Sequence, residues 1–228
     1  MSKLTLIIGN KNYSSWSLRP WVLMKHHQLN FVEKRVALFT ETTDQVLSEY
    51  HSDFKVPILQ DDELVVWDSL SILEYISEQH LQNRGWPADK NARAIARSIS
   101  AEMHSSYSSI RNELPMNCRK KFSNIELSED AQRELARIKE LWRKCRSEFG
   151  SGGEWLFGEY SIADAMFAPI ALRLNGYSIH LAGVEQSYVT SVLRHPAIVE
   201  WMEAGKLETE VIEADEIETG PVCVNDMD

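Results

Sequence analysis

The residues best placed to do chemistry are two adjacent serines near the N-terminus. Ser14 and Ser15 follow a short apolar run, Leu4 to Ile8, and come just before a helical pattern that begins near Trp16. Hydroxyl groups there can cap a helix, and the unpaired N–H groups and positive dipole end of a helix attract an anion. The pair therefore suits the stabilisation of an anion such as a thiolate, with helix capping alone as the alternative.

A second polar pair, Asp68 and Ser69, stands in the same relation to a later helix. The pair precedes apolar positions that recur at helical spacing, so one of its members is expected to be the N-cap. These two helix starts are the places where the first part of the chain can present charge-stabilising groups.

The elements that must position these pairs alternate between strand and helix. The pattern predicts a right-handed α/β unit over residues 1–82. Its expected elements are a strand at 4–8, a helix at 16–28, a strand at 31–38, a loose helix at 40–50, a hairpin at 56–60 and 64–67, and a helix opened by Asp68-Ser69.

The rest of the chain reads as helical. The polar stretch 83–90 predicts a domain boundary, and residues 91–207 predict an all-helical domain. Ser161-Ile162-Ala163-Asp164 has the form of a capping box that starts a helix, in which Pro169 is expected to cause a bend. The other expected helices span 91–117, 128–149 and 196–207, and the acidic tail 208–228 is expected to lie on the surface or to be partly disordered.

Composition excludes several classes of function. A net charge of −10 argues against nucleic acid as a partner, and no apolar run is long enough to span a membrane. Three cysteines without a CxxC pair, and the adjacent His26 and His27, predict neither a disulfide framework nor a metal site. A cytoplasmic protein is the expectation.

Taken together, the order of elements and four motifs resemble the cytosolic glutathione S-transferase superfamily. The motifs are Ser14-Ser15-Trp16-Ser17-Leu18-Arg19, Val56-Pro57, Asp68-Ser69 and the capping box at 161–164. The serine-rich motif is most similar to the zeta class, which includes maleylacetoacetate isomerases. The resemblance implies a thioredoxin-like α/β domain followed by an all-α domain, with glutathione as co-substrate and a homodimer as the assembly.

The resemblance also implies a role for each matching residue. Ser14 is the preferred catalytic hydroxyl for the glutathione thiol, with Ser15 supplying a second contact; the alternative is that Ser15 is the catalytic hydroxyl. Asp68 takes the ligand's ammonium group and Ser69 its γ-glutamyl carboxylate. Val56 pairs through its backbone before a cis Pro57, and Lys55 reaches a carboxylate. The alternatives are capping by Asp68 and Ser69, an ordinary trans proline, and an exposed surface lysine.

For the electrophile, family geometry implies a pocket between the first loop and the long helix. Arginines there would bind a dicarboxylate by forked hydrogen bonds, unless they are surface or ion-pair residues. Trp16 replaces a cysteine that zeta relatives often carry, which disfavours thiol-transferase chemistry and weakens the isomerase assignment. The candidate pocket residues are Trp16, Arg19, Met103, His104, Tyr107 and Arg111, together with Arg173.

The expected function is transfer of glutathione, activated by a serine, to an electrophilic carbon. Two alternatives remain open: a glutathione-dependent cis–trans isomerase, and a non-catalytic relative that acts as a regulatory or binding protein. The intact Ser-Ser, Val-Pro and Asp-Ser motifs argue against the last.

Overall fold

A computed structural model describes residues 3–50 and 53–217 of the 228-residue chain. A mixed four-stranded sheet with strand order β2-β1-β3-β4 forms its first layer. β1 pairs in parallel with β2 and antiparallel with β3, and β3 pairs antiparallel with β4. The bounds are β1 Leu4–Ile8, β2 Val32–Arg35, β3 Ile58–Asp61 and β4 Leu64–Trp67.

The central strand β1 is buried on both faces. Leu4, Leu6 and Ile8 pack into the main core. Ile7 packs on the other face in a second, smaller core with Val36, Leu47, Tyr50 and Ile58. A strand covered on both sides needs apolar residues at every position rather than alternating ones, which explains its continuous Leu-Ile run. The predicted strand–helix order is confirmed over this unit.

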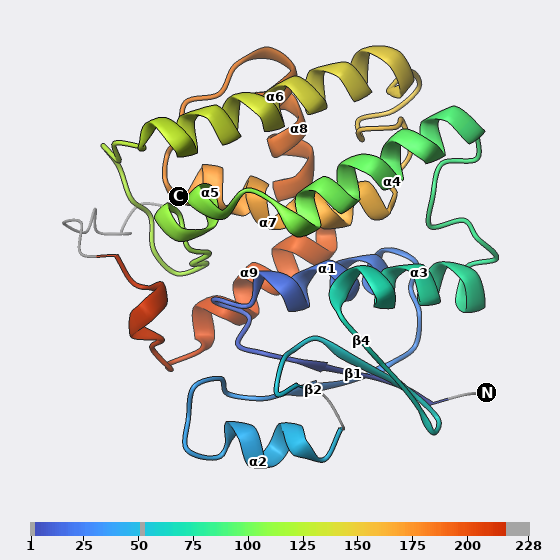
Figure 1. Ribbon diagram of the computed structural model, residues 1–228, viewed down its shortest axis with the longest axis vertical. Helices are drawn as coiled ribbons and strands as arrows, with labels where there is room; N and C mark the ends of the chain where they lie inside the picture. The colour runs from blue at the N-terminus through green and yellow to red at the C-terminus, as the bar shows by residue number, and fades with distance from the viewer. Residues whose placement is uncertain (1–2, 51–52, 218–228) are drawn as a thin grey trace.

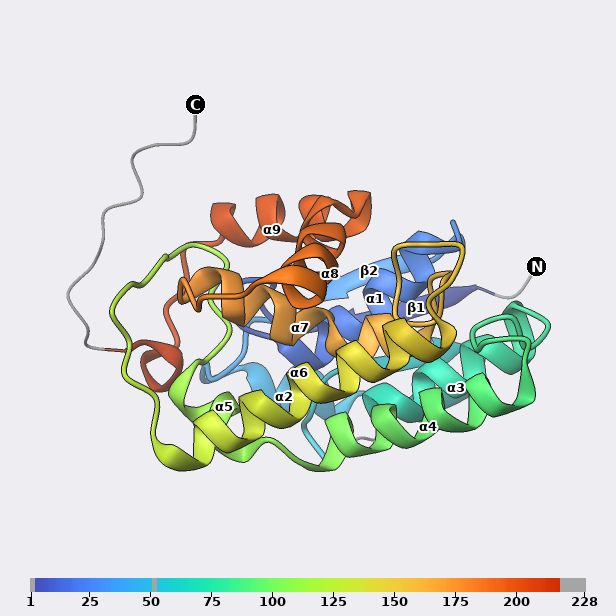
Figure 2. The ribbon, with the colours of Figure 1, turned by 90° about the horizontal axis from the view of Figure 1, so that it is seen from above.

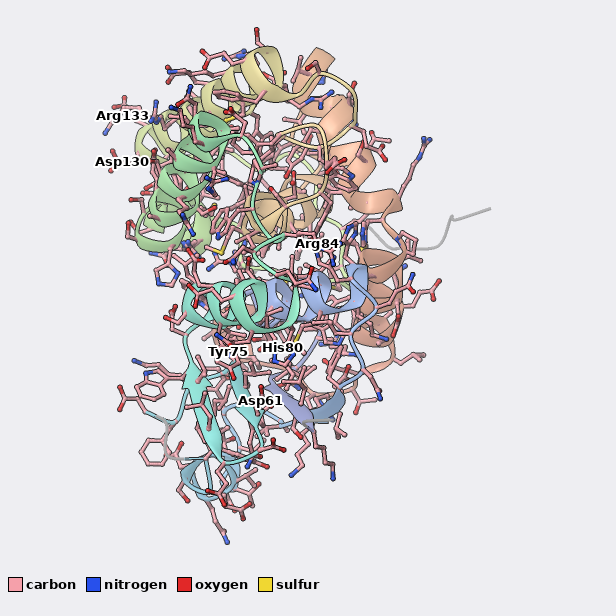
Figure 3. The ribbon with its side chains drawn as sticks, turned by 90° about the vertical axis from the view of Figure 1, so that its right-hand side faces the viewer. Asp61, Tyr75, His80, Arg84, Asp130 and Arg133 are labelled. Carbon is pink, nitrogen blue, oxygen red and sulfur yellow. The ribbon has the colours of Figure 1, made fainter. Side chains whose placement is uncertain are left out.

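Three helices cover this sheet. Figure 1 shows α1 and α3 on one face of the sheet and α2 on the other. Tyr75 and His80 of α3 both contact Asp61 at the end of β3, each at 2.9 Å from Oδ2 (Figure 3), and so fix this helix to the sheet. The helices are α1 Ser15–His26, α2 Thr43–Ser48 and α3 Ser69–His80.

Residues 90–207 form a helical layer on α1 and α3 (Figures 1 and 2). At its centre α7 is buried along nearly its whole length, as expected of a helix that is apolar on every side. The helices are α4 Lys90–Ser105, α5 Ser108–Glu113, α6 Glu129–Phe149, α7 Ile162–Gly176, α8 Gly183–Arg194 and α9 Pro196–Leu207.

One contiguous core joins the two layers: it contains side chains of β1, α1 and α3 together with those of the later helices. The sheet unit and the helical layer are therefore packed as a single body. The start of α1, with Ser14 as its N-cap and Ser15 as its first residue, contacts the helical layer through Arg173 of α7. The domain limits predicted from the sequence, 1–82 and 91–207, stay predictions.

The single long helix predicted for 91–117 is wrong, because the chain turns at Tyr107. This residue has a left-handed backbone, with φ at 65°, and its hydroxyl donates to Glu102 at 2.6 Å. The carboxylate of Glu134 on α6 then accepts from the N–H groups of Ser109 and Ile110 and caps the new helix, α5.

The structure also tests the predictions for the last helices and for the acidic tail. The capping box at the start of α7 is confirmed, with Asp164 accepting from the N–H of Ser161 at 2.9 Å, and this helix continues through Pro169. α8 lies in a segment where the sequence pattern predicted no helix. The expected surface tail is only partly described: residues 208–217 pack against the first loop, and 218–228, with Cys223, lie outside the described residues.

The described part of the chain contains neither a membrane-spanning helix nor a cluster of metal ligands. There, no helix is long and apolar enough to cross a membrane. Over residues 3–50 and 53–217, no group of three or more His, Cys, Asp or Glu side chains is arranged to hold a metal ion. Cys118 and Cys145 are buried thiols, neither in a disulfide.

Candidate active site

A cavity of about 960 Å³ lies where the loop before α1 meets α3, α4, α5 and α7. It brings together both polar pairs that the sequence singled out, Ser14 with Ser15 and Asp68 with Ser69. Lys55, Val56 and Pro57 lie on the same wall. Residues distant in sequence are thus gathered around one space, as a ligand site requires.

Ser14 is the N-cap of α1. Its Oγ lies 3.4 Å from the N–H of Ser17, a long cap contact, and 2.8 Å from the Ser17 hydroxyl. The Ser17 oxygen also accepts from the N–H of Gly9 at 3.1 Å. The Ser14 hydroxyl donates to this Ser17 oxygen, and because hydroxyl protons rotate, the Ser14 proton can turn to an anion in the cavity instead.

Ser15 has a different partner. The guanidinium of Arg173, from α7, donates to the Ser15 oxygen at 3.2 Å, so the Ser15 hydroxyl proton is also available for a ligand. A hydroxyl that accepts from a cation is the stronger donor. Both serines are almost fully buried yet line the cavity.

The Trp16 indole forms one wall beside the serines and does not close the cavity over them. The guanidinium groups of Arg19 and Arg111 lie over the indole at 4.2 and 4.8 Å from its ring centroid. The His104 ring meets it edge-on at 5.3 Å. These contacts hold the large side chain in one orientation.

Three arginines around the cavity lack acidic partners. Over the described residues, no carboxylate lies within 4.0 Å of the guanidinium nitrogens of Arg19, Arg111 or Arg173. Arg173 donates instead to the carbonyls of Arg111, at 3.1 Å, and Leu114. The wall of the cavity nevertheless carries charges of both signs, with Arg173 placed directly at Ser15; the acidic lining residues are Asp44, Asp53, Asp68 and Asp215.

Burial lowers the pKa values of several basic side chains around the cavity. Burial, followed by the neighbouring charges of Arg111 and Arg173, holds the pKa of Arg19 well below its usual value. Burial and then Arg111 lower the pKa of Arg173 to about 10, so this side chain still carries its charge at neutral pH. Burial also lowers the pKa of His104, although Asp68 opposes the shift.

Asp68 serves both helix and cavity. Oδ1 accepts from the N–H groups of Leu70 and Ser71 at 2.9 and 3.2 Å and caps α3, whereas Oδ2 lies 3.2 Å from His104 Nε2. Asp68 has a positive φ of 71°, a conformation that non-glycine residues rarely adopt. Residues held in this way cluster at functional sites.

Next to Asp68, Ser69 accepts from Arg19 at 3.2 Å, which places a buried cation directly behind its hydroxyl. Arg19 itself lies outside the cavity lining. Its charge can thus act on a ligand carboxylate at Ser69 without touching it.

The Val56–Pro57 peptide bond is cis, as the resemblance implied. Pro57 is buried, Val56 is half-buried, and Lys55 is exposed at the cavity edge. The backbone of Val56 is therefore at the cavity wall, where an extended ligand can pair with it.

Some predicted pocket residues lie elsewhere. Met103 and Tyr107 belong to the core and do not line the cavity, whereas Trp16, His104, Arg111 and Arg173 do. No sequence motif indicated the remaining lining residues: Tyr13, Leu38, Phe39, Thr40, Thr43, Asp44, Asp53, Phe54, Trp67, Ile212 and Asp215.

Comparisons with known proteins match part of the chain to a known family. Residues 13–79 match the family described as "Glutathione S-transferase, N-terminal domain". A "Probable maleylacetoacetate isomerase" of Caenorhabditis elegans is 33% identical over 98 residues, which are 43% of this chain and 45% of that protein. The match thus spans less than half of the relative's length.

Solved structures match over most of the chain. A glutathione transferase homologue from Burkholderia GL BGR1, with bound glutathione, has a TM-score of 0.66 and 24% identity, over 90% of this chain and 98% of the other. Glutathione S-transferase unclassified 2 from Bombyx mori has a TM-score of 0.70 and 18% identity, over 90% and 94% of the two chains. At these identities the likeness establishes the fold.

Proposed function

We propose that this chain, which has the glutathione S-transferase fold and the matching N-terminal domain, binds glutathione and transfers it to electrophilic carbon. The observation that carries the proposal is the cavity at the start of α1, where two serine hydroxyls lie beside a guanidinium, that of Arg173, which forms no ion pair with a described residue. A free thiol has a pKa of about 8.5, so only a few per cent of it is thiolate at neutral pH. Hydroxyl donors and nearby cations favour the anion and thereby lower the thiol pKa.

The proposed roles follow the contacts. Ser14 donates to the sulfur, with Ser17 behind it, and Ser15 supplies a second donor held by Arg173. Asp68 Oδ2 receives the γ-glutamyl ammonium, and Ser69 the neighbouring carboxylate. Val56 pairs with the cysteinyl backbone, and Lys55 is within the reach of the glycine carboxylate.

A second candidate is glutathione-dependent cis–trans isomerisation of an unsaturated acid. The thiolate would add to the conjugated alkene, the resulting single bond would rotate, and elimination would return the thiolate. The worm isomerase relative and the two cavity arginines, Arg111 and Arg173, support this candidate. Forked guanidinium groups suit a substrate carboxylate.

Assembly as a homodimer and a cytoplasmic location stay predictions. A regulatory role without catalysis also stays an alternative, and the gathering of all three motifs around one cavity argues against it.

One experiment separates the candidates. The protein is passed over immobilised glutathione and then assayed with chlorodinitrobenzene and with maleylacetone. Retention with conjugation supports the transferase, and retention with turnover of maleylacetone alone supports the isomerase. Folded protein that is not retained would refute both.

A further inference from the structure

The segment 208–217, here called the strap, follows α9 and returns to the loop that carries the serines. It is the red segment beyond α9 in Figure 1. Two carboxylates, Glu208 and Glu216, fasten it at its two ends.

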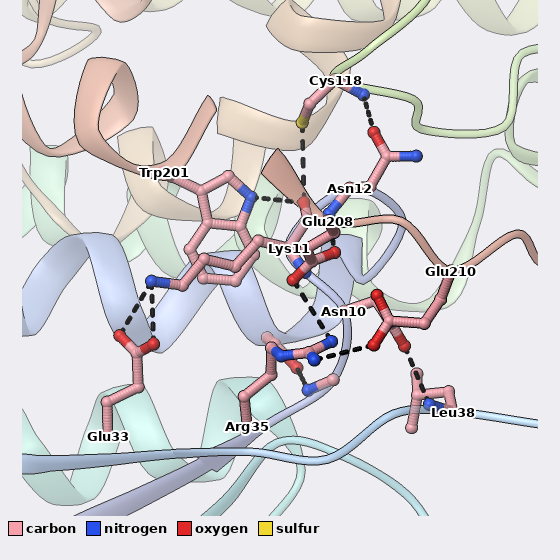
Figure 4. A network of polar contacts seen from close by, with 12 residues as sticks. Asn10, Lys11, Asn12, Glu33, Arg35, Leu38, Cys118, Trp201, Glu208 and Glu210 are labelled. Carbon is pink, nitrogen blue, oxygen red and sulfur yellow. Dashed lines mark hydrogen bonds and ion pairs between the residues drawn. The ribbon is translucent and has the colours of Figure 1, made fainter. Parts of the chain in front are cut away.

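The first attachment is at Glu208, whose side chain is 8% exposed. Its two oxygens accept from the backbone N–H groups of Lys11 and Asn12 at 2.8 and 3.0 Å (Figure 4). Arg35 pairs with Glu210 at 2.7 Å. The strap is thus bound to the backbone of the loop just before the serines.

The second attachment is at Glu216. Its Oε1 accepts from the Tyr13 hydroxyl at 2.5 Å and from Asn117 Nδ2 at 3.1 Å, and its Oε2 pairs with Lys120. Arg119 contacts both attachments. It donates to the carbonyl of Glu208 at 2.6 Å and to the hydroxyl of Tyr13, the partner of Glu216, at 2.6 Å.

Between the attachments, Ile212 and Asp215 line the active-site cavity. Ile212 is buried, and the Asp215 side chain makes no hydrogen bond or ion pair with any described residue. Burial raises the pKa of the Asp215 carboxyl, and the charge of Arg173 acts against that shift. A carboxylate held in a cavity next to an arginine, yet beyond ion-pair distance, is available to act on a ligand.

Building on the proposed function, we propose that the strap is the outer wall of the electrophile site and that Asp215 determines its specificity. Arg111 and Arg173 attract one acidic group of the electrophile, Ile212 and Trp16 contact its apolar body, and Asp215 repels a second acidic group. The favoured substrates are apolar electrophiles with a single carboxylate.

The test uses glutathione conjugates that place different charges in the electrophile site. Dissociation constants of S-ethylglutathione and S-dicarboxyethylglutathione are measured by calorimetry for wild-type protein, Asp215→Asn and Glu213→Gln. Glu213 is the matched control, because it lies on the same strap, is exposed and does not line the cavity.

The dicarboxylate conjugate is expected to gain affinity relative to the ethyl conjugate by about thirtyfold in Asp215→Asn, the effect of one unit charge about 8 Å away at an effective dielectric constant near 20. In Glu213→Gln the ratio should stay within about twofold, since an exposed charge outside the cavity is screened.

An unchanged ratio in Asp215→Asn would overturn the inference while leaving the proposed function intact. An equal loss of affinity for both conjugates in that variant would also overturn the inference, because such a loss would indicate a structural role for Asp215. Failure of folded wild-type protein to bind either conjugate would refute glutathione as the ligand, and with it the proposed function and this inference.

Discussion

Replacing Ser14 by alanine removes the hydroxyl that we propose donates to the glutathione sulfur. A hydrogen bond to a charged group contributes about 1.5–3 kcal/mol, and one pKa unit corresponds to about 1.4 kcal/mol. The thiol pKa of bound glutathione should therefore rise by about one to two units. The cost in stability should be about 0.5–1 kcal/mol, because the cap contact to the Ser17 N–H, at 3.4 Å, is long.

The assay is the ultraviolet absorbance of the thiolate, recorded against pH at saturating glutathione. Ser128→Ala is the matched control, because Ser128 caps α6 through a similar contact, to the N–H of Ala131 at 3.2 Å, and does not line the cavity. The control should lose similar stability in urea unfolding while leaving the thiol pKa unchanged.

Two results would refute the reasoning about Ser14. One is a thiol pKa in Ser14→Ala within a few tenths of wild type. The other is an equal rise in both variants, which would show that loss of a helix cap alone accounts for the change.

Three further predictions concern other residues. Asp68→Asn keeps the α3 cap but loses the charge opposite the ligand's ammonium, so the KM for glutathione should rise about tenfold or more, whereas the cap variant Asp89→Asn should leave it unchanged. Arg173→Gln should lower kcat/KM about tenfold for a carboxylate-bearing electrophile and less for a neutral one; equal losses would contradict a role in recognition. Burial lowers the pKa of His26 to about 4 and that of His195 below its usual value, so the unfolded chain binds more protons below about pH 6.5. The part of the stability that depends on these two histidines should therefore be fully present above that pH and be lost from there towards pH 4. His195→Asn, which can still cap α9, should reduce this loss in urea unfolding measured against pH.

Much of the first layer was predictable because its signals are local. The unbroken apolar run of β1, the serine cap of α1 and the Asp68 cap of α3 each act within a few residues, and the structure confirms these elements. The break at Tyr107 was not predictable, because the helix after it, α5, is capped by Glu134, a residue of the distant helix α6.

The candidate site was likewise predictable only where its signals are local in the sequence. Short motifs indicated the serines and the Asp68–Ser69 pair, which the structure brings to one cavity. Family geometry implied Met103 and Tyr107 as pocket walls, but both side chains belong to the core. Asp215 reaches the cavity only through long-range contacts of the strap, which no local pattern could reveal.

The central claim is that the sulfur of glutathione binds as a thiolate at the start of α1. A crystal structure of the wild-type protein soaked in glutathione tests it most directly. The account predicts the sulfur within hydrogen-bonding distance of Ser14 Oγ, with Ser15 Oγ close by. A sulfur bound away from both hydroxyls, or a Trp16 ring that covers them, would contradict it.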